Sequence, residues 1–187
     1  MHNQTKLLTY SALMCAVLVV STLWFKFTLP GTDVLFTTQV LFVLLCGQIL
    51  PVRYCLLSSG LYMLLGLCGL PVFSAVSGPS VVLTPSFSYL LGFPFAAACV
   101  AIIVKRRDGL LGRVVASVAG LVVLYVVALA YIAALKALYL SSPIGFGALV
   151  TSYCLAFLPL DLVKAVLAAL LGKRLEKPLR LTMANRG

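Results

Sequence analysis

Six long apolar runs follow one another along almost the whole chain, with short polar, basic or proline-containing connections between them. About 20 consecutive apolar residues cross a bilayer as a helix, which also satisfies its own backbone hydrogen bonds in lipid. With 63% hydrophobic and only 10% charged residues, almost nothing is left for a soluble domain. We therefore expect an all-α integral membrane protein, a compact bundle of six transmembrane helices forming a single domain over residues 1–187. The runs cover about residues 7–25, 35–50, 54–69, 87–104, 110–135 and 159–175.

Basic residues are concentrated in alternate connections between these runs. The formal net charge is +10, from 14 lysines and arginines against 4 acids. The basic residues lie between apolar runs rather than on a soluble face, which argues against nucleic-acid binding. Cytoplasmic connections carry the excess of lysine and arginine, so we expect a multi-pass plasma-membrane protein with both termini in the cytoplasm. Eleven of the fourteen basic residues fall on that side: Lys6, Arg53, Lys105, Arg106, Arg107, Arg113, Lys173, Arg174, Lys177, Arg180 and Arg186.

Two ionisable residues, Asp161 and Lys164, open the last apolar run. Proline suits the first turn of a helix, so we expect a helix from about Pro159 with Asp161 in its first turn. Residues three apart share a helix face, which brings this acid and this amine together. A charge near the bilayer centre costs roughly 3 kcal/mol, so such groups usually face a cavity or a partner. We interpret the pair as a contact for a ligand from outside, with a purely structural ion pair as the alternative.

The connection over residues 69–86 is irregular and uncharged. Its three prolines and two glycines argue against a regular helix. A segment that is both irregular and apolar is poorly suited to extend into water, and with six spans it lies on the same outer side as Asp161 and Lys164. We expect an apolar extracellular lid loop between the third and fourth helices that closes over the pair.

The first run carries small residues at spacings of three and four, namely Ser11, Ala12, Cys15 and Ala16. Such a stripe lets another helix approach closely. The neighbour is either a helix of the same bundle or a helix of a partner protein, and the spacing alone does not distinguish the two.

The inventory of reactive groups is thin for catalysis. The single histidine, His2, stands at the terminus, and the six cysteines are scattered through apolar runs without metal-binding spacing. With no nucleotide-binding glycine motif either, we expect no metal, no cofactor and no enzyme, and active transport would need a partner that binds ATP. A small intramembrane enzyme, with Asp161 as base and Lys164 as electrostatic stabiliser, is the alternative from another class.

A pocket with a carboxylate, an ammonium, the amide of Gln39 and aromatic walls would suit a compact ligand with an apolar body. A cyclic urea needs acceptors for its two N–H groups and a donor for its carbonyl, while a carboxylate tail needs a lysine or a helix N-terminus. The inventory fits such a molecule, and it would also fit other vitamins.

Four short segments, in the same order and at similar spacing over most of the chain, carry a family resemblance. They are Thr38-Gln39, Gly-Leu-Cys-Gly-Leu-Pro-Val-Phe at 66–73, Pro85 with Tyr-Leu-Leu-Gly-Phe at 89–93, and Phe-Leu-Pro-Leu-Asp-Leu-Val-Lys at 157–164. Together they resemble the BioY family, the biotin-specific substrate-binding (S) components of energy-coupling factor (ECF) transporters. The resemblance implies a six-helix membrane bundle that captures biotin from outside, while a transmembrane coupling subunit and two ATPase subunits supply the ATP-driven step. It implies no cofactor of its own.

The same resemblance assigns roles to particular residues. It implies that Asp161 and Lys164 contact the polar groups of biotin, with Gln39, Phe73 and Tyr89 as further ligand contacts. For these three the alternatives are a helix-bridging amide, plain packing and an interfacial anchor, respectively.

Helix docking and ligand choice are the other implications of the resemblance. The stripe with Ala12 and Ala16 resembles the motif by which S components dock onto the coupling subunit. Capture of a different vitamin by the same fold is the alternative function. The chain departs from the family pattern over residues 74–88, so the contacts of that loop are not predicted.

Overall fold

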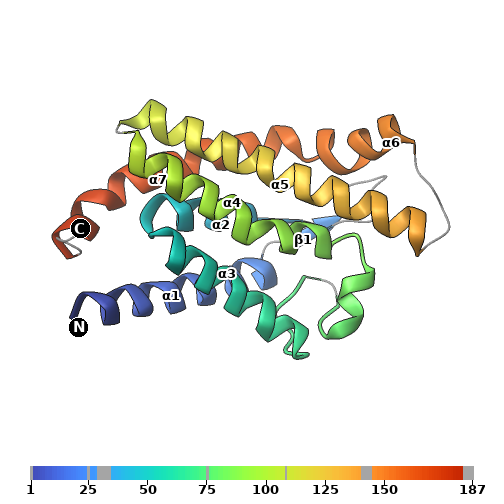
Figure 1. The fold of residues 1–187 in the computed structure, drawn as a ribbon, viewed down its shortest axis with the longest axis horizontal. Coiled ribbons are helices and arrows are strands. Elements are labelled where there is room, and N and C mark those ends of the chain that lie inside the picture. The colour runs from blue at the N-terminus through green and yellow to red at the C-terminus, as the bar shows by residue number, and fades with distance from the viewer. Residues whose placement is uncertain are drawn as a thin grey trace.

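The structure is a computed structural model that describes residues 2–24, 26–28, 35–74, 76–107, 109–139 and 145–182, and it is dominated by helices packed lengthwise (Figure 1). Two short strands, a 3₁₀ turn (η1) and a π-helical turn (η2) interrupt the helical pattern. In chain order the elements are α1 (His2–Trp24), β1 (Lys26–Thr28), β2 (Leu35–Thr37), α2 (Gln39–Ile49), α3 (Val52–Leu67), η1 (Pro79–Leu83), α4 (Phe87–Arg106), α5 (Leu110–Leu138), α6 (Phe146–Val150), η2 (Thr151–Leu155) and α7 (Leu158–Thr182).

Three of the described helices, α1, α4 and α5, are long and apolar enough to cross a membrane. Helix α6 with η2 forms a pair with α7, and the two members are bent by 43° at the break between them. When this pair is counted as one span, the number of spans is four. Helices α2 and α3 are apolar but shorter. The predicted helical membrane fold is confirmed at this level, and each expected apolar run overlaps one of these helices.

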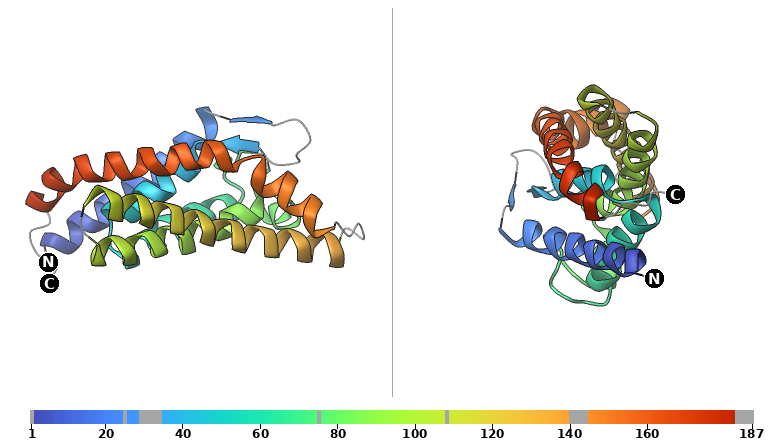
Figure 2. Two further views of the ribbon diagram at one scale, coloured as in Figure 1. Left: turned by 90° about the horizontal axis from the view of Figure 1, so that it is seen from above. Right: turned by 90° about the vertical axis from the view of Figure 1, so that its left-hand side faces the viewer.

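The prediction was wrong where α1 leads into α2. Residues 26–34 were expected to form a polar connection and residue 35 to begin the second helix. Instead, β1 and β2 pair antiparallel, with Phe27 opposite Phe36, and α2 begins only at Gln39 (Figure 2). Threonine and phenylalanine favour extended backbone, and pairing satisfies the polar backbone groups of both strands. The connection with Pro30, Gly31 and Asp33 lies outside the described residues.

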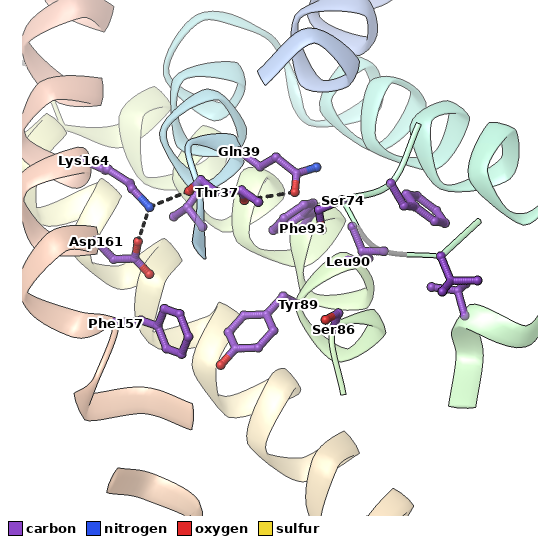
Figure 3. Close-up of a pocket in the computed structure, with 14 residues that line it drawn as sticks. Thr37, Gln39, Ser74, Ser86, Tyr89, Leu90, Phe93, Phe157, Asp161 and Lys164 are labelled. Carbon is purple, nitrogen blue, oxygen red and sulfur yellow. Dashed lines mark hydrogen bonds and ion pairs between the residues drawn. The ribbon is translucent and has the colours of Figure 1, made fainter. Parts of the chain in front are cut away.

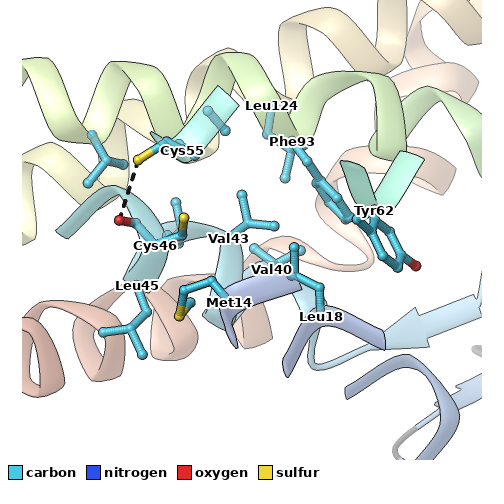
Figure 4. Close-up of a cluster of buried hydrophobic side chains, with 14 of the residues drawn as sticks. Met14, Leu18, Val40, Val43, Leu45, Cys46, Cys55, Tyr62, Phe93 and Leu124 are labelled. Carbon is cyan, nitrogen blue, oxygen red and sulfur yellow. Dashed lines mark hydrogen bonds between the residues drawn. The ribbon is translucent and has the colours of Figure 1, made fainter. Parts of the chain in front are cut away.

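Helix α2 is the centre of the bundle, with nine of its eleven residues buried. It packs against α4 and α7 on two sides and against α1 on a third. The core cluster includes Met14, Leu18, Val43 and Phe93, contributed by three different helices (Figure 4). At Gly47 the backbones of α2 and α4 approach so closely that the position requires glycine, because a Cβ there would lie 2.5 Å from the carbonyl oxygen of Ala97 on α4.

A polar cluster joins α2, α5 and α7 near the start of α5. The start of α5 lies toward the end of the bundle where α1 begins and α7 ends (Figures 1 and 2). Gln48 of α2 donates through Nε2 to the carbonyl oxygen of Arg113 at 2.8 Å and to Ser117 Oγ at 2.9 Å. Arg113 of α5 is 4% exposed, and its Nη1 donates to Gln48 Oε1 at 3.0 Å. Its Nη2 lies 2.9 Å from Glu176 Oε2 of α7. We call Gln48, Arg113, Ser117 and Glu176 the Arg113 cluster.

Candidate ligand-binding site

A cavity of about 40 Å³ lies near the starts of α2 and α7, whereas the Arg113 cluster joins later parts of the same two helices. Its walls come from the start of α2, from α4, from the first turns of α7 and from the segment between α3 and α4. We call residues 69–86 the cover segment. It contributes Phe73, Ser74, Val81 and Ser86 to the walls, and η1 makes part of it regular, which the prolines had argued against.

Asp161 and Lys164 meet inside this cavity (Figure 3). Lys164 Nζ lies 2.7 Å from Asp161 Oδ1, and the two side chains are only 9% and 4% exposed, respectively. The same ammonium donates to the carbonyl oxygen of Thr37 at 2.7 Å. On the other side, the hydroxyl of Tyr125 donates to Asp161 Oδ2 at 2.6 Å. A buried pair of this kind offsets its desolvation only with good geometry and further hydrogen bonds, and both are present here.

The local sequence explains how this acid and amine reach the cavity. Helix α7 begins at Leu158, one residue before the predicted start, and Asp161 stands in its first turn as expected. Immediately before it, η2 is a π-helical turn and the chain bends. π-Helical turns are rare overall, and those that do occur are often found at functional sites. Asp161 and Lys164 are buried, whereas Leu162 and Val163 between them are exposed. The spacing of three therefore puts the acid and the amine on one inward face of α7.

Gln39 lines the cavity and also bridges neighbouring elements. Its Nε2 donates to the hydroxyl of Tyr62 on α3 at 2.6 Å, and its Oε1 accepts from Thr37 Oγ1 at 3.1 Å. Tyr62 in turn donates to the carbonyl oxygen of Val72 in the cover segment at 3.0 Å. Gln39 is therefore both a wall of the cavity and a helix-bridging amide.

Phe73 forms an apolar wall of the cavity and is held from behind. It is 5% exposed and packs edge-on against Tyr62, with ring centroids 5.4 Å apart. The ring lies directly over Gly66 of α3, where an added Cβ would be 2.0 Å from a ring carbon. The glycine therefore leaves the space that the phenylalanine ring occupies.

Tyr89 of α4 lines the cavity with its ring, next to Phe157 (Figure 3). Its hydroxyl donates to the carbonyl oxygen of Tyr153 in η2. Its ring packs edge-on against Tyr125 at 6.4 Å between centroids. With the hydroxyl bonded to the backbone, Tyr89 offers the cavity mainly an aromatic surface.

The small residues of α1 are divided between two faces. Ser11 and Cys15 are buried, and Ser11 Oγ donates to the carbonyl oxygen of Tyr54 on α3 at 2.9 Å. Ala12 and Ala16 are exposed on the outside of the bundle. Ala16 borders an apolar groove between α1 and α2 that also includes Val20. The stripe therefore serves packing inside the bundle on one side and is open to a neighbour on the other.

Sequence reasoning missed Tyr125 and Thr37. Tyr125 stands in the middle of an apolar run with no polar neighbour to draw attention to it. Thr37 contacts Lys164 through its backbone carbonyl, which no side-chain pattern reveals. Within the described residues, no group of three or more histidines, cysteines or acids is placed to hold a metal ion.

The apolar helices, with a buried acid and amine beside a cavity between them, define a class, a multi-pass helical membrane protein with a small-molecule cavity between its helices. A family model described as the BioY family matches residues 1–181. The chain belongs to the BioY family, and the resemblance carried by four short segments is confirmed.

Curated relatives support this membership. The probable biotin transporter BioY of Lysinibacillus sphaericus is 31% identical over 191 aligned positions, which cover 96% of this chain and 92% of that protein. The biotin transporter BioY of Thermotoga maritima is 32% identical over 151 positions, covering 80% of this chain and 85% of that protein. The biotin transporter BioY of Rhizobium etli is 33% identical over 180 positions, with 90% and 92% covered, respectively.

The fold resembles a solved structure along almost its whole length. That structure, at 2.1 Å, is the S-component for biotin from an ECF-type ABC transporter. The TM-score is 0.82 at 25% identity, and the match covers 95% of this chain and 94% of the other. The present chain therefore has the fold of an S component.

Proposed function

We propose that this protein is the biotin-binding S component of an ECF-type importer, a membrane transport subunit rather than an enzyme. The observation that carries the proposal is the buried Asp161–Lys164 pair lining a cavity of an S-component fold. Charges kept inside a membrane bundle usually serve a ligand or a transport path.

The cavity offers complementary groups for biotin. Asp161 accepts from the ureido N–H groups, and Lys164 donates to a carbonyl or carboxylate oxygen. Gln39 lies within the same polar end of the cavity and can both donate and accept. Phe73 and Tyr89 supply the apolar and aromatic surface against which the hydrocarbon parts of the ligand pack.

The cavity expands when biotin enters. Small-molecule sites usually have a volume of about 300–1,000 Å³, whereas this cavity measures about 40 Å³. The cover segment is the wall with the least regular structure, so we propose that it acts as an extracellular lid and moves outward. Phe73 and Val81, both buried in this segment, would then move with it.

The chain forms a single six-span domain over residues 1–187 in this proposal. Helices α2 and α3 complete the six spans, although each is shorter than a usual span. The start of α1 and the end of α7 lie on the side with most of the basic residues. In this proposal that side faces the cytoplasm, and the cavity opens outward.

ATP-driven release into the cell requires partner subunits. We propose a transmembrane coupling subunit and two ATPase subunits, with the coupling subunit docking on the exposed face of α1 that carries Ala12 and Ala16. The support is the exposure of these two small residues beside an apolar groove, which allows a close helix contact.

Binding of labelled biotin by the purified protein in detergent tests the function. We expect saturable binding that desthiobiotin blocks and that thiamine and riboflavin do not. Blocking by thiamine or riboflavin instead of desthiobiotin would indicate an S component for a different vitamin. Absence of binding to any of the four compounds would contradict the proposal.

The position of Phe73 gives a matched pair of variants on α3. In Gly66→Ala the new methyl group collides with the Phe73 ring, so we expect biotin affinity to fall roughly tenfold, with a loss of stability of about 1–3 kcal/mol typical of overpacking. Gly60→Ala is the control, because nothing lies within 4 Å of a Cβ there. Equilibrium binding and thermal unfolding of both variants provide the measurement. Equal affinity in the two variants would remove Phe73 from the site.

A further inference from the structure

Tyr125 contacts the site from behind its wall. This tyrosine lies in the middle of α5, is 5% exposed and is not one of the residues that line the cavity. Its hydroxyl donates to Asp161 Oδ2 at 2.6 Å, on the carboxylate oxygen that does not face Lys164. Hydrogen bonds to an ionised acceptor are among the shorter and stronger ones in proteins.

Two donors on different oxygens hold a carboxylate in a way that one donor does not. The terminal torsion of aspartate is broad, so a single contact leaves the plane of the carboxylate free to turn. Lys164 Nζ holds Oδ1 at 2.7 Å, and the Tyr125 hydroxyl holds Oδ2. Since a carboxylate offers about four lone-pair sites, each oxygen keeps capacity for a further donor.

Tyr125 is itself held in place by packing. Its ring meets the Tyr89 ring edge-on, and Tyr89 is anchored through its hydroxyl to the backbone of η2. The donor is therefore in place before a ligand arrives, as a well-supported binding site requires.

We infer that Tyr125 is a positioning residue for biotin recognition: it fixes the plane of the Asp161 carboxylate so that its remaining lone pairs meet the ureido N–H groups. The inference rests on the proposed function, because it names the residue that orients the acceptor of that same site. It predicts that Tyr125 acts only through Asp161. A tyrosine that merely ties α5 to α7, or that shapes the pocket by its bulk, would act whether or not Asp161 carries its carboxylate.

A double-mutant cycle separates these two roles. Four proteins are compared in biotin binding: wild type, Tyr125→Phe, Asp161→Asn and the double variant. We expect Tyr125→Phe to weaken binding roughly tenfold in the wild-type background and less than about twofold in the Asp161→Asn background, since coupled partners are not additive. Phenylalanine keeps the ring and its contact with Tyr89, so the change removes only the hydroxyl.

An infrared measurement reads the contact without any ligand. The chain has three aspartates, Asp33, Asp108 and Asp161, so protein labelled with carboxyl-¹³C aspartate gives few carboxylate bands. We expect the wild-type minus Tyr125→Phe difference spectrum to contain a shifted aspartate carboxylate band. The same difference taken in the Asp161→Asn background should lack that band.

The outcomes are distinct. Wild-type protein that binds biotin, with Tyr125→Phe binding equally well, overturns the inference alone. An equal loss of affinity in both backgrounds, or an unshifted aspartate band, also overturns it. Wild-type protein that does not bind biotin refutes the proposed function itself and the inference with it.

Discussion

Replacing Asp161 with asparagine is expected to lower biotin affinity by at least roughly 100-fold. Truncating one partner of a buried, hydrogen-bonded charge pair typically costs about 2–5 kcal/mol, and about 1.4 kcal/mol corresponds to tenfold in affinity. The variant removes the acceptor charge of the site and leaves the ammonium of Lys164 in a cavity wall where the side chain is only 9% exposed. Titration with labelled biotin measures the effect.

The same change is expected to destabilise the protein by about 3 kcal/mol, because a buried charge loses its counter-charge. The control is the double variant Asp161→Asn/Lys164→Met, which leaves no unpaired charge. Its stability should return to within about 1 kcal/mol of wild type, while biotin affinity stays at least roughly 100-fold below that of wild type. Thermal unfolding of the three proteins in one detergent provides the comparison.

Unaltered biotin binding by the double variant would remove Asp161 and Lys164 from the site. Recovery of binding together with stability would show that the pair serves the fold alone. Only loss of binding in a stable protein fits the assignment, since it separates the ligand contact from the structural ion pair.

Replacing Glu176 with glutamine is expected to destabilise the protein by about 2 kcal/mol without changing biotin affinity by more than about twofold. The change removes the carboxylate 2.9 Å from Arg113, whose side chain is 5% exposed. A fully buried pair would lose about 3–5 kcal/mol, and the 20% exposure of the Glu176 side chain lowers the figure through solvent screening.

Glu176→Gln complements Asp161→Asn because it removes an ion pair that is not part of the cavity. The Arg113 cluster joins later parts of α2 and α7, away from the cavity at the starts of these helices, so its loss should act on the whole fold and not on the ligand. Lys173→Gln is the control on the same helix, because Lys173 is exposed and such changes usually stay within about 0.5 kcal/mol. A large fall in biotin affinity for Glu176→Gln would contradict the separation of the Arg113 cluster from the cavity.

The helices and the acid–amine pair could be predicted from the sequence because each depends on residues close together in the chain. Apolar runs long enough to cross a bilayer placed α1, α4 and α5 to within a few residues. The spacing of Asp161 and Lys164, with the proline before them, was enough to predict a shared face in the first turns of a helix. The structure brings the two charged groups to 2.7 Å.

Features that depend on contacts between distant segments were not readable. The β1–β2 pairing joins residues across a connection. The contact between Tyr125 and Asp161 joins two residues that lie 36 positions apart, on α5 and α7. Neither leaves a periodic signal in the sequence. The space that Gly66 leaves for Phe73 likewise depends on how the cover segment folds back over α3. Tyr89 was predicted as a ligand contact and lines the cavity, but the backbone partner of its hydroxyl was not predicted.

The short central helix has a consequence for how the protein is made. With eleven residues, α2 is about 16 Å long, roughly half the hydrocarbon thickness of a bilayer, so lipid alone cannot hold it across the membrane. Its principal neighbours, α4 and α7, are synthesised later. During translation α2 therefore lacks these two neighbours until they have been synthesised. The cavity, lined by Gln39 of α2 and Lys164 of α7, is completed only when the last helix has inserted.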